Sequence, residues 1–550
     1  MHPWRQIYDP LHFWPASTLL AALPIVFLLA LLAIWQVRPH LAAVWAAALA
    51  MAVAILGFGM PWRAVVASFG FGAAFGIFKI AWIVIAAVFL YELTVATGQF
   101  AALQRSLGAV SRDHRLLTLL IAFSLGAFLE GAAGFGAPVA IAGAFLVGLG
   151  FAPLQAAVVC LVANTAPVAF GSIGIPIHVL VAVTGLPEPQ VGAMIGRILP
   201  LVSPVVAFWT VRMMCTWAET WEVLPAILVA GGSFGLVQFA WSNFMNASLT
   251  DIVAALASLA SLILFLRVWQ PRSLMTSVAA AGSGSRVVAT TGSPIRPSTW
   301  SVARAYVPFV LLSATVLLWG APRVKAWMDH TTLWVAVPGL DGHVMRMPPV
   351  VPHPFAEVAR FDVTWLSGTG TSVFVAALLT ALVLWVPPGV VLGALKRSLV
   401  RMRWAMLAIA CMLGLSYVTR YSGMDAVLGL AFTRTGRFYP FFGTFLGWLG
   451  VALTGSDTAS NALFGSLQRL TAEQLKLSPI LMAAANSAGG VMGKMIDAQS
   501  IVVATAATDQ VGKEGRIFRR VFWHSVALGA IVALIVVFYA FVAPEWVPKG

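Results

Sequence analysis

The chain has 550 residues, of which 60% are hydrophobic and 9% are charged, and its formal net charge is +14. Because soluble proteins carry roughly 25% charged residues, this composition excludes an ordinary soluble domain and predicts a polytopic membrane protein. The positive charge does not indicate nucleic-acid binding, because the basic residues lie in short loops between apolar runs, where they are typical of orientation signals.

Apolar runs follow one another along the whole chain. Because about 20 apolar residues cross a bilayer, the sequence predicts an all-α membrane protein with roughly 12 to 14 membrane helices. The first spans are 16–35, 41–57, 75–98, an irregular block at 116–180, 193–215, 223–240 and 250–269. The later ones are 304–320, 368–387, 403–419, a second irregular block at 440–508, and 522–543.

Two longer connections interrupt this series. Residues 270–300 are rich in Ser, Gly and Thr, which is typical of a flexible linker. Residues 321–363 mix both signs of charge with prolines and aromatics, and we expect an ordered loop outside the membrane.

Lysines and arginines concentrate in four connections: 101–115, 267–304, 396–403 and 512–520. The positive-inside rule assigns these connections to the cytoplasm. Both termini and the 321–363 loop then lie outside, and so must 420–437, although that loop is basic as well.

This membrane topology gives the two halves of the chain opposite orientations in the membrane. Inverted repeats are typical of secondary transporters, whose sites lie near the midplane where broken helices meet. We therefore divide the chain into a first repeat at 1–215, connecting helices and a cytoplasmic linker at 216–300, and a second repeat at 301–550.

Each irregular block contains two elements that glycine or proline should break. They are 128–140 (FLEGAAGFGAPVA), 164–176 (NTAPVAFGSIGIP), 453–464 (LTGSDTASNALF) and 486–500 (NSAGGVMGKMIDAQS). Freed backbone groups are tolerated at membrane depth only where protein or a water-filled cavity satisfies them. Helix N-termini also attract carboxylates, so these elements are expected to form a site for an anion.

Charged residues in these elements are the first candidates for function. A charge at the bilayer centre costs roughly 2.5 to 3.5 kcal/mol, so Glu130, Asp457 and Lys494 call for an explanation. We expect Lys494 to bind the anion, although it could instead neutralise Asp457 or Asp497 as a structural ion pair. The other candidates for substrate binding are Asn164, Asn486, Gly134, Gly136, Gly455, Ser456 and Thr458.

Other residues and motifs favour no second function. Polar residues elsewhere in the spans fit structural roles better: Lys79, Glu92, His178, Arg197 and Arg420. The three cysteines lack paired spacing, and neither a metal site nor a cofactor is expected. The sequence contains no P-loop, zinc-protease motif or arginine-repeat voltage sensor, which argues against a pump, a membrane enzyme and a channel.

Four segments resemble the bacterial L-lactate permease family: FLEGAAGFGAPVA, NTAPVAFG, GWLGVALTGSDTASNALF and GKMIDAQSI. The resemblance covers nearly the whole chain except 273–299. It implies uptake of L-lactate, and usually glycolate and related 2-hydroxymonocarboxylates, in symport with protons across the bacterial inner membrane. It also implies a plan similar to ion transporters with two inverted repeats and re-entrant hairpins.

A small hydroxy acid offers little to recognise beyond its carboxylate and its hydroxyl group. Asn164 and Asn486 carry amides that both donate and accept, so they are expected to bind the hydroxyl, although each could instead cap a helix. Two alternatives stay open. One is a sodium-coupled or broader organic-anion carrier on the same scaffold, and the other is a lactate-sensing or partner-binding membrane protein.

Glu130 is the expected carrier of the coupled proton. Its apolar surroundings disfavour the charged form, and the neighbouring glycines should give it access to water. Asp457, in the opposite repeat, is the competing carrier, and proximity to Lys494 would keep it ionised.

The membrane topology predicts which segments an impermeant thiol reagent reaches in intact cells. A single cysteine placed in the 321–363 loop of a cysteine-free chain should be labelled, whereas one at position 285 should not. The reverse pattern would contradict the assigned orientation.

Overall fold

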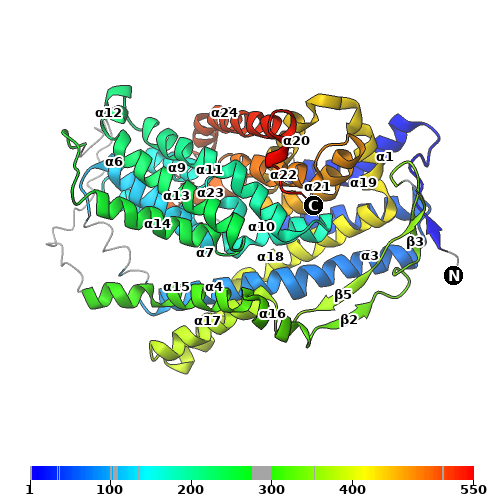
Figure 1. The fold of residues 1–550 in the computed structure, drawn as a ribbon, viewed down its shortest axis with the longest axis horizontal. Coiled ribbons are helices and arrows are strands. Elements are labelled where there is room, and N and C mark those ends of the chain that lie inside the picture. The colour runs from blue at the N-terminus through cyan, green and yellow to red at the C-terminus, as the bar shows by residue number, and fades with distance from the viewer. Residues whose placement is uncertain are drawn as a thin grey trace.

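The computed structural model describes residues 3–549 apart from 34, 36, 100, 101, 103–109, 133–136, 276–298, 352, 511 and 512. The described chain is mostly helical, and most of the long helices lie roughly along the longest axis (Figure 1). Short strands occur near the N-terminus and between residues 333 and 363, so the predicted all-α fold is right in its membrane part and has a small β addition.

The elements up to residue 265 are β1 (Trp4–Arg5), α1 (Trp14–Ala33), α2 (Pro39–Leu56), α3 (Trp62–Phe75), η1 (Gly76–Ala81), α4 (Trp82–Ala96), α6 (His114–Leu117), η2 (Thr118–Leu125), α7 (Gly126–Ala132), α8 (Ala137–Gly148), α9 (Pro153–Ala163), η3 (Val168–Phe170), α10 (Gly171–Thr184), α11 (Glu188–Arg212), α12 (Trp217–Glu222), α13 (Leu224–Phe244) and α14 (Thr250–Phe265).

The elements after residue 298 are α15 (Thr299–Gly320), α16 (Pro322–Asp329), β2 (Leu333–Ala336), β3 (Val344–Arg346), β4 (Phe355–Ala356), β5 (Arg360–Val363), α17 (Thr369–Val383), α18 (Pro388–Ser422), α19 (Met424–Phe432), η4 (Thr433–Phe438), α20 (Tyr439–Thr454), α21 (Asp457–Gln474), α22 (Pro479–Gly493), α23 (Ala498–Ala507), α24 (Glu514–Phe541) and η5 (Pro544–Trp546).

Six helical segments among the described residues are long and apolar enough to cross a membrane: Trp62–Ala96, His114–Ala132, Glu188–Arg212, Leu224–Phe244, Pro388–Ser422 and Glu514–Phe541. A seventh span is the pair Pro153–Ala163 and Val168–Thr184, which is bent by 65° at a short break. Further apolar helices are shorter than a full span. The multi-span helical fold with a broken helix is thereby confirmed, and the total number of membrane helices stays a prediction.

The segment His114–Ala132 is enclosed by the rest of the protein along its whole apolar window. Its middle part, η2, is a π-helix, a form that often occurs at functional sites. Helices α13 and α14 pack together, and α14 packs in turn against η2 and α7. A helix surrounded by protein can carry a polar side chain without exposing it to lipid.

One end of the molecule gathers the N-terminal segment and the 321–363 loop (Figure 1). Strand β1 pairs with β3 in parallel, β3 pairs with β4, and β2 pairs with β5. Arg420, at the end of α18, donates to Glu357 at 3.3 Å, and Glu357 also pairs with Arg346. These contacts put residues 3–10, 321–363 and the start of 420–437 at the same end of the molecule. The membrane topology expected from the sequence places these three segments on the same side of the membrane.

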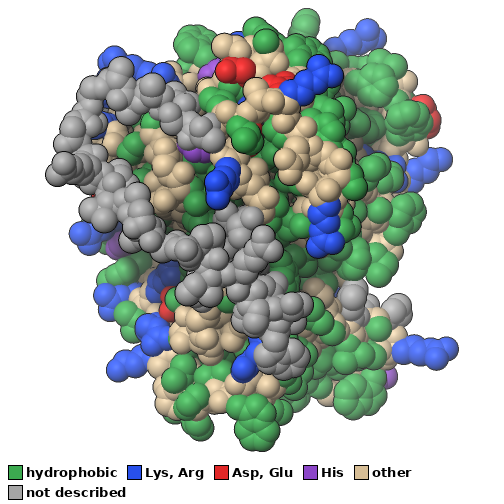
Figure 2. Space-filling model, turned by 90° about the vertical axis from the view of Figure 1, so that its left-hand side faces the viewer, with side chains coloured by type: hydrophobic (Ala, Val, Ile, Leu, Met, Phe, Trp, Pro, Cys, Tyr) green, Lys and Arg blue, Asp and Glu red, His purple; other side chains and the backbone are tan. Residues whose placement is uncertain are grey.

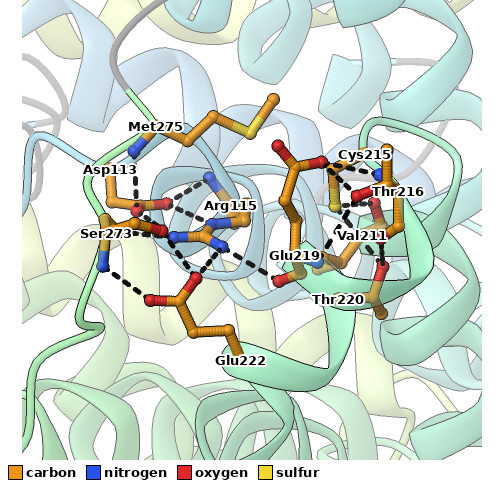
Figure 3. Close-up of polar contacts among 10 residues, drawn as sticks. All are labelled: Asp113, Arg115, Val211, Cys215, Thr216, Glu219, Thr220, Glu222, Ser273 and Met275. Carbon is orange, nitrogen blue, oxygen red and sulfur yellow. Dashed lines mark hydrogen bonds and ion pairs between the residues drawn. The ribbon is translucent and has the colours of Figure 1, made fainter.

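The opposite end is seen in Figure 2, where more Lys and Arg than Asp and Glu side chains are visible. One basic residue that the sequence suggested as a loop charge, Arg115, is instead fully buried there. It bonds to Asp113 at 2.8 Å, to Glu222 at 3.0 Å and to the carbonyl oxygen of Ser273 at 2.7 Å (Figure 3). This cluster ties α6, α12 and the start of the 270–300 connection together.

Removal of the Arg115 guanidinium should therefore destabilise the protein much more than removal of a solvated charge. Arg115→Met leaves the carboxylates of Asp113 and Glu222 without their common partner, and breaking a buried pair costs about 3 to 5 kcal/mol. Arg112→Met removes the same charge from an exposed position in the same segment and is the matched control. Thermal unfolding in detergent measures both, and equal midpoints for the two variants would contradict the structural role of Arg115.

Candidate functional site

A cavity of about 1300 Å³ lies where the broken elements of the two halves meet. Several predicted site residues line it together: Glu130, Gly455, Ser456, Asp457, Thr458 and Lys494. Helices α10, α18, α23 and α24 supply most of the remaining wall. The sequence therefore identified residues that the fold brings to one place, although they lie more than 300 positions apart in the chain.

The break in the first half runs from the end of α9 into the first turn of α10. Ser172, Ile173 and Gly174 have φ angles of 47°, 61° and 73°, in the left-handed region. A β-branched residue such as Ile173 rarely adopts this conformation, and local strain of this kind clusters at functional sites. The break places Ser172 on the cavity wall.

Glu130 faces this break from α7. Its side chain is only 5% exposed, and Asn164 donates its amide N–H to Glu130 Oε2 at 3.2 Å. A Cβ at Gly171 would lie 2.9 Å from Glu130 Oε1, so glycine is what lets the carboxyl group sit against the start of α10. Asn164 does not line the cavity. Its position behind Glu130 fits orientation of the acid better than the expected contact with a substrate hydroxyl.

The break in the second half is a turn of two residues between α20 and α21. Gly455 has a φ of 73°, and Ser456 caps α21 by accepting from the N–H of Ala459 at 3.3 Å. The first residues of α21, Asp457 and Thr458, also line the cavity. The positive end of this helix therefore faces the cavity, as expected for an anion site.

Asp457 is held by donors from its own half. Its Oδ2 atom accepts from Ser487 Oγ at 2.5 Å and from Asn461 Nδ2 at 3.3 Å. Its Oδ1 atom has no hydrogen-bond partner among the residues that the structure describes. A Cβ at Gly490 would overlap Oδ1, so this position, like Gly171, leaves room for an acid.

Lys494, at the end of α22, is nearly buried at the cavity wall. Its Nζ donates to the carbonyl oxygen of Gly455 at 2.5 Å and lies 3.5 Å from Asp497 Oδ2. Asp497 also caps α23 by accepting from the N–H of Ser500 at 2.7 Å. Of the two ion pairs that the sequence left open, the geometry therefore forms the one with Asp497.

A further predicted substrate contact, Asn486, lies outside this cavity lining. Asn486 is fully buried and uses its amide inside the protein, donating to Asn461 at 2.9 Å and accepting from Gln468 at 3.2 Å. Its contact with a substrate hydroxyl stays a prediction. Gly134 and Gly136 fall within 133–136, outside the described residues.

The weaker candidates are mostly engaged in contacts away from the cavity. These contacts are Lys79 with Asp362, Glu92 with Arg397 and Arg401, Arg197 with Asn243, and Arg420 with Glu357. They join helix ends to neighbouring segments, which supports the structural roles expected for these residues.

One buried acid near the site was missed by the sequence analysis. Asp251, in the first turn of α14, is fully buried and accepts from Gln238 Nε2 at 3.3 Å. A Cβ at Gly131 would lie 3.1 Å from the Cβ of Asp251, so this acid sits directly beside the Glu130 segment. Its only sequence signal is a lone acid at the start of the apolar run 250–269.

The comparisons with known proteins agree in pointing to one family. The family model of L-lactate permeases matches residues 17–543. The chain is 45% identical to the glycolate permease GlcA of Escherichia coli K12, over 98% of this chain and 99% of that protein. It is 44% identical to an L-lactate permease of Salmonella typhimurium LT2 over the full length of both, and 40% identical to one of Bacillus subtilis 168 over 97% of both. A match of this length and identity shows that the chain belongs to the L-lactate permease family.

Proposed function

We propose that this permease takes up L-lactate, glycolate and related small 2-hydroxymonocarboxylates in symport with protons. Its relatives, which it matches over their full length, are named L-lactate permeases and a glycolate permease. The observation that carries the proposal is the convergence of a lysine, a helix N-terminus and a buried acid on one cavity, namely Lys494, the start of α21 and Glu130.

The substrate carboxylate binds between Lys494 and the start of α21. Hydrogen bonds in which both partners are charged are roughly twice as strong as neutral ones, and the α21 dipole adds a favourable field. In this structure Lys494 donates to the Gly455 carbonyl. A substrate carboxylate can take the place of that carbonyl as the acceptor. The hydroxyls of Ser456, Thr458 and Ser172 line the same cavity and are better placed than the two asparagines to bind the substrate hydroxyl.

Glu130 carries the coupled proton. It lies between the cavity and the second buried acid, Asp251, so it can exchange a proton with groups on two sides. Lys494 and Asp497 also act on it electrostatically. A protonated Glu130 beside lactate avoids adding a second negative charge to the substrate in a medium where unpaired charge is costly.

The cavity extends from this site toward the basic end of the molecule. Its lining includes Arg38, His40 and Trp404, and the ring of His40 stacks on that of Trp404 at 4.6 Å. Trp404 directly follows the basic stretch 396–403, which was expected as a loop but lies within α18, and which the charge pattern assigns to the cytoplasm. We therefore take this conformation as open to the cytoplasm, with Arg346, Glu357 and Arg420 closing the other end.

Replacement of Lys494 should weaken lactate binding. Lys494→Met removes a charged hydrogen-bond donor, worth about 1.5 to 3 kcal/mol, which corresponds to about a 10- to 150-fold rise in Kd. Lys396 is an exposed lysine on α18, and the Lys396→Met variant should bind lactate as the wild type does. Calorimetric titration with lactate measures Kd for the wild type and for both purified variants. Normal affinity in Lys494→Met, with binding lost in Asp457→Asn, would assign the anion site elsewhere.

Glu130→Gln should separate binding from coupling. The amide keeps the size of the side chain and cannot carry a proton, so proteoliposomes should lose lactate accumulation driven by an imposed proton gradient. Lactate counterflow at equal pH on both sides, which needs no net proton movement, should persist. Normal accumulation in Glu130→Gln would transfer the role to Asp457.

The same assay distinguishes the alternative functions. Accumulation by the wild type that requires sodium and ignores pH would identify a sodium-coupled carrier. Absence of any net flux would favour a lactate sensor.

A further inference from the structure

A second series of polar residues runs from the surface toward Glu130, and its outer members lie outside the substrate cavity. It starts at Glu188, the first residue of α11, whose side chain is 39% exposed. Glu188 Oε2 lies 3.5 Å from His178 Nδ1, and His178 Nε2 lies 3.3 Å from Ser248 Oγ. None of these three residues lines the cavity.

The series continues inward toward α14. Ser248 lies in the turn that precedes this helix, and Asp251, the second residue of the helix, follows it by three positions. Asp251 Oδ1 accepts from Gln238, which also donates to the carbonyl oxygen of Ala166 in the break between α9 and α10 at 3.4 Å. Asp251 Oδ2 has no hydrogen-bond partner among the described residues. A buried oxygen in this state calls for an explanation.

Asp251 meets the Glu130 segment where α7 packs against α14. The close approach at Gly131 brings the two acids near enough to interact electrostatically. Two carboxylates that share a buried site are not readily charged together. Such a pair is therefore suited to holding one proton that passes from one acid to the other.

We propose that Glu188, His178, Ser248 and Asp251 form a proton access route to Glu130 that is separate from the substrate cavity. The inference rests on the proposed proton symport. His178 takes a proton from solvent beside Glu188 and passes it to Ser248, whose hydroxyl releases its own proton to the Asp251 carboxylate. Asp251 then protonates Glu130 and returns to its charged form. One proton enters, one reaches Glu130, and only O–H and N–H bonds change.

The outer end of this route and the part of the cavity lined by Trp404 lie well apart along α18. Arg420 follows Trp404 by 16 positions on α18, which is about 24 Å along the helix axis. Trp404 lines the cavity, whereas Arg420 donates to the carbonyl oxygen of Val183, near the end of α10 that follows His178. Protons and substrate can therefore reach the central site from different sides.

The charged groups around the route come from several elements. Glu188 and Lys325, on α11 and α16, face His178. Glu130 faces Asp251, and on its cavity side Lys494 and Asp497 act on it. The pH dependence of transport in any variant has to be interpreted with these groups in place.

Variants of the full-length protein in proteoliposomes test the route. His178→Gln and Asp251→Asn keep hydrogen-bonding groups of similar size and cannot relay a proton at neutral pH. Lactate-driven proton movement, measured with a pH-sensitive dye, should slow about tenfold or more, while lactate counterflow stays within about twofold of the wild type. Asp251→Glu restores an acid and should recover most of the proton movement. Asp425→Asn removes a buried acid on α19, outside the route, and should change neither rate.

The outcomes separate this route from the proposed function. Wild-type proton movement in both His178→Gln and Asp251→Asn would overturn the route and leave proton symport intact. Loss of counterflow together with proton movement in both variants would mean a structural role, and would overturn it as well. A wild type that moves lactate without protons would refute the proposed function first, and the route with it.

Discussion

The architecture of the site depends on one constraint: a backbone or side-chain polar group freed inside a membrane must find its partner within the protein. The carbonyl of Gly455 accepts from Lys494, Ser456 caps α21, and Asp497 caps α23 while pairing with Lys494. Lys494 thus satisfies a carbonyl of the neighbouring break, whereas Ser456 and Asp497 each cap the helix that begins at their own break. Gly455, Ser456 and Lys494 also line the cavity, so the same residues serve the structure and the proposed function.

The two halves place an acid in similar surroundings. In the first half Glu130 meets an amide donor, Asn164, and the space left by Gly171. In the second half Asp457 meets a hydroxyl donor, Ser487, and the space left by Gly490. This correspondence supports the division into two inverted repeats, which remains a proposal. The halves differ in one respect. A further acid, Asp251 on α14, lies beside the segment that carries Glu130, and not beside Asp457.

The sequence predicted the breaks because glycine, proline and charge inside apolar runs are local signals. It did not predict that Asn164 donates to Glu130 or that Asn486 bonds to Asn461 and Gln468, because the identity of a side chain does not tell which way it points. The partner of Lys494 stayed open for a similar reason, since Asp457 and Asp497 were both candidates and only the packing of α20, α22 and α23 decides between them. Asp251 carried no motif, and its importance depends on a contact with α7 that no spacing reveals.

The complete enclosure of the His114–Ala132 segment by other helices has a consequence for how the protein responds to its lipid. Membranes of different thickness act on a transporter through the helices that touch acyl chains, which tilt or deform to match the hydrocarbon layer. The helix that carries Glu130 touches none along its apolar window, so a change of lipid reaches the acid only after passing through the surrounding shell. Proton chemistry at this position is thereby insulated from the composition of the bilayer, whereas the outer helices bear the adjustment.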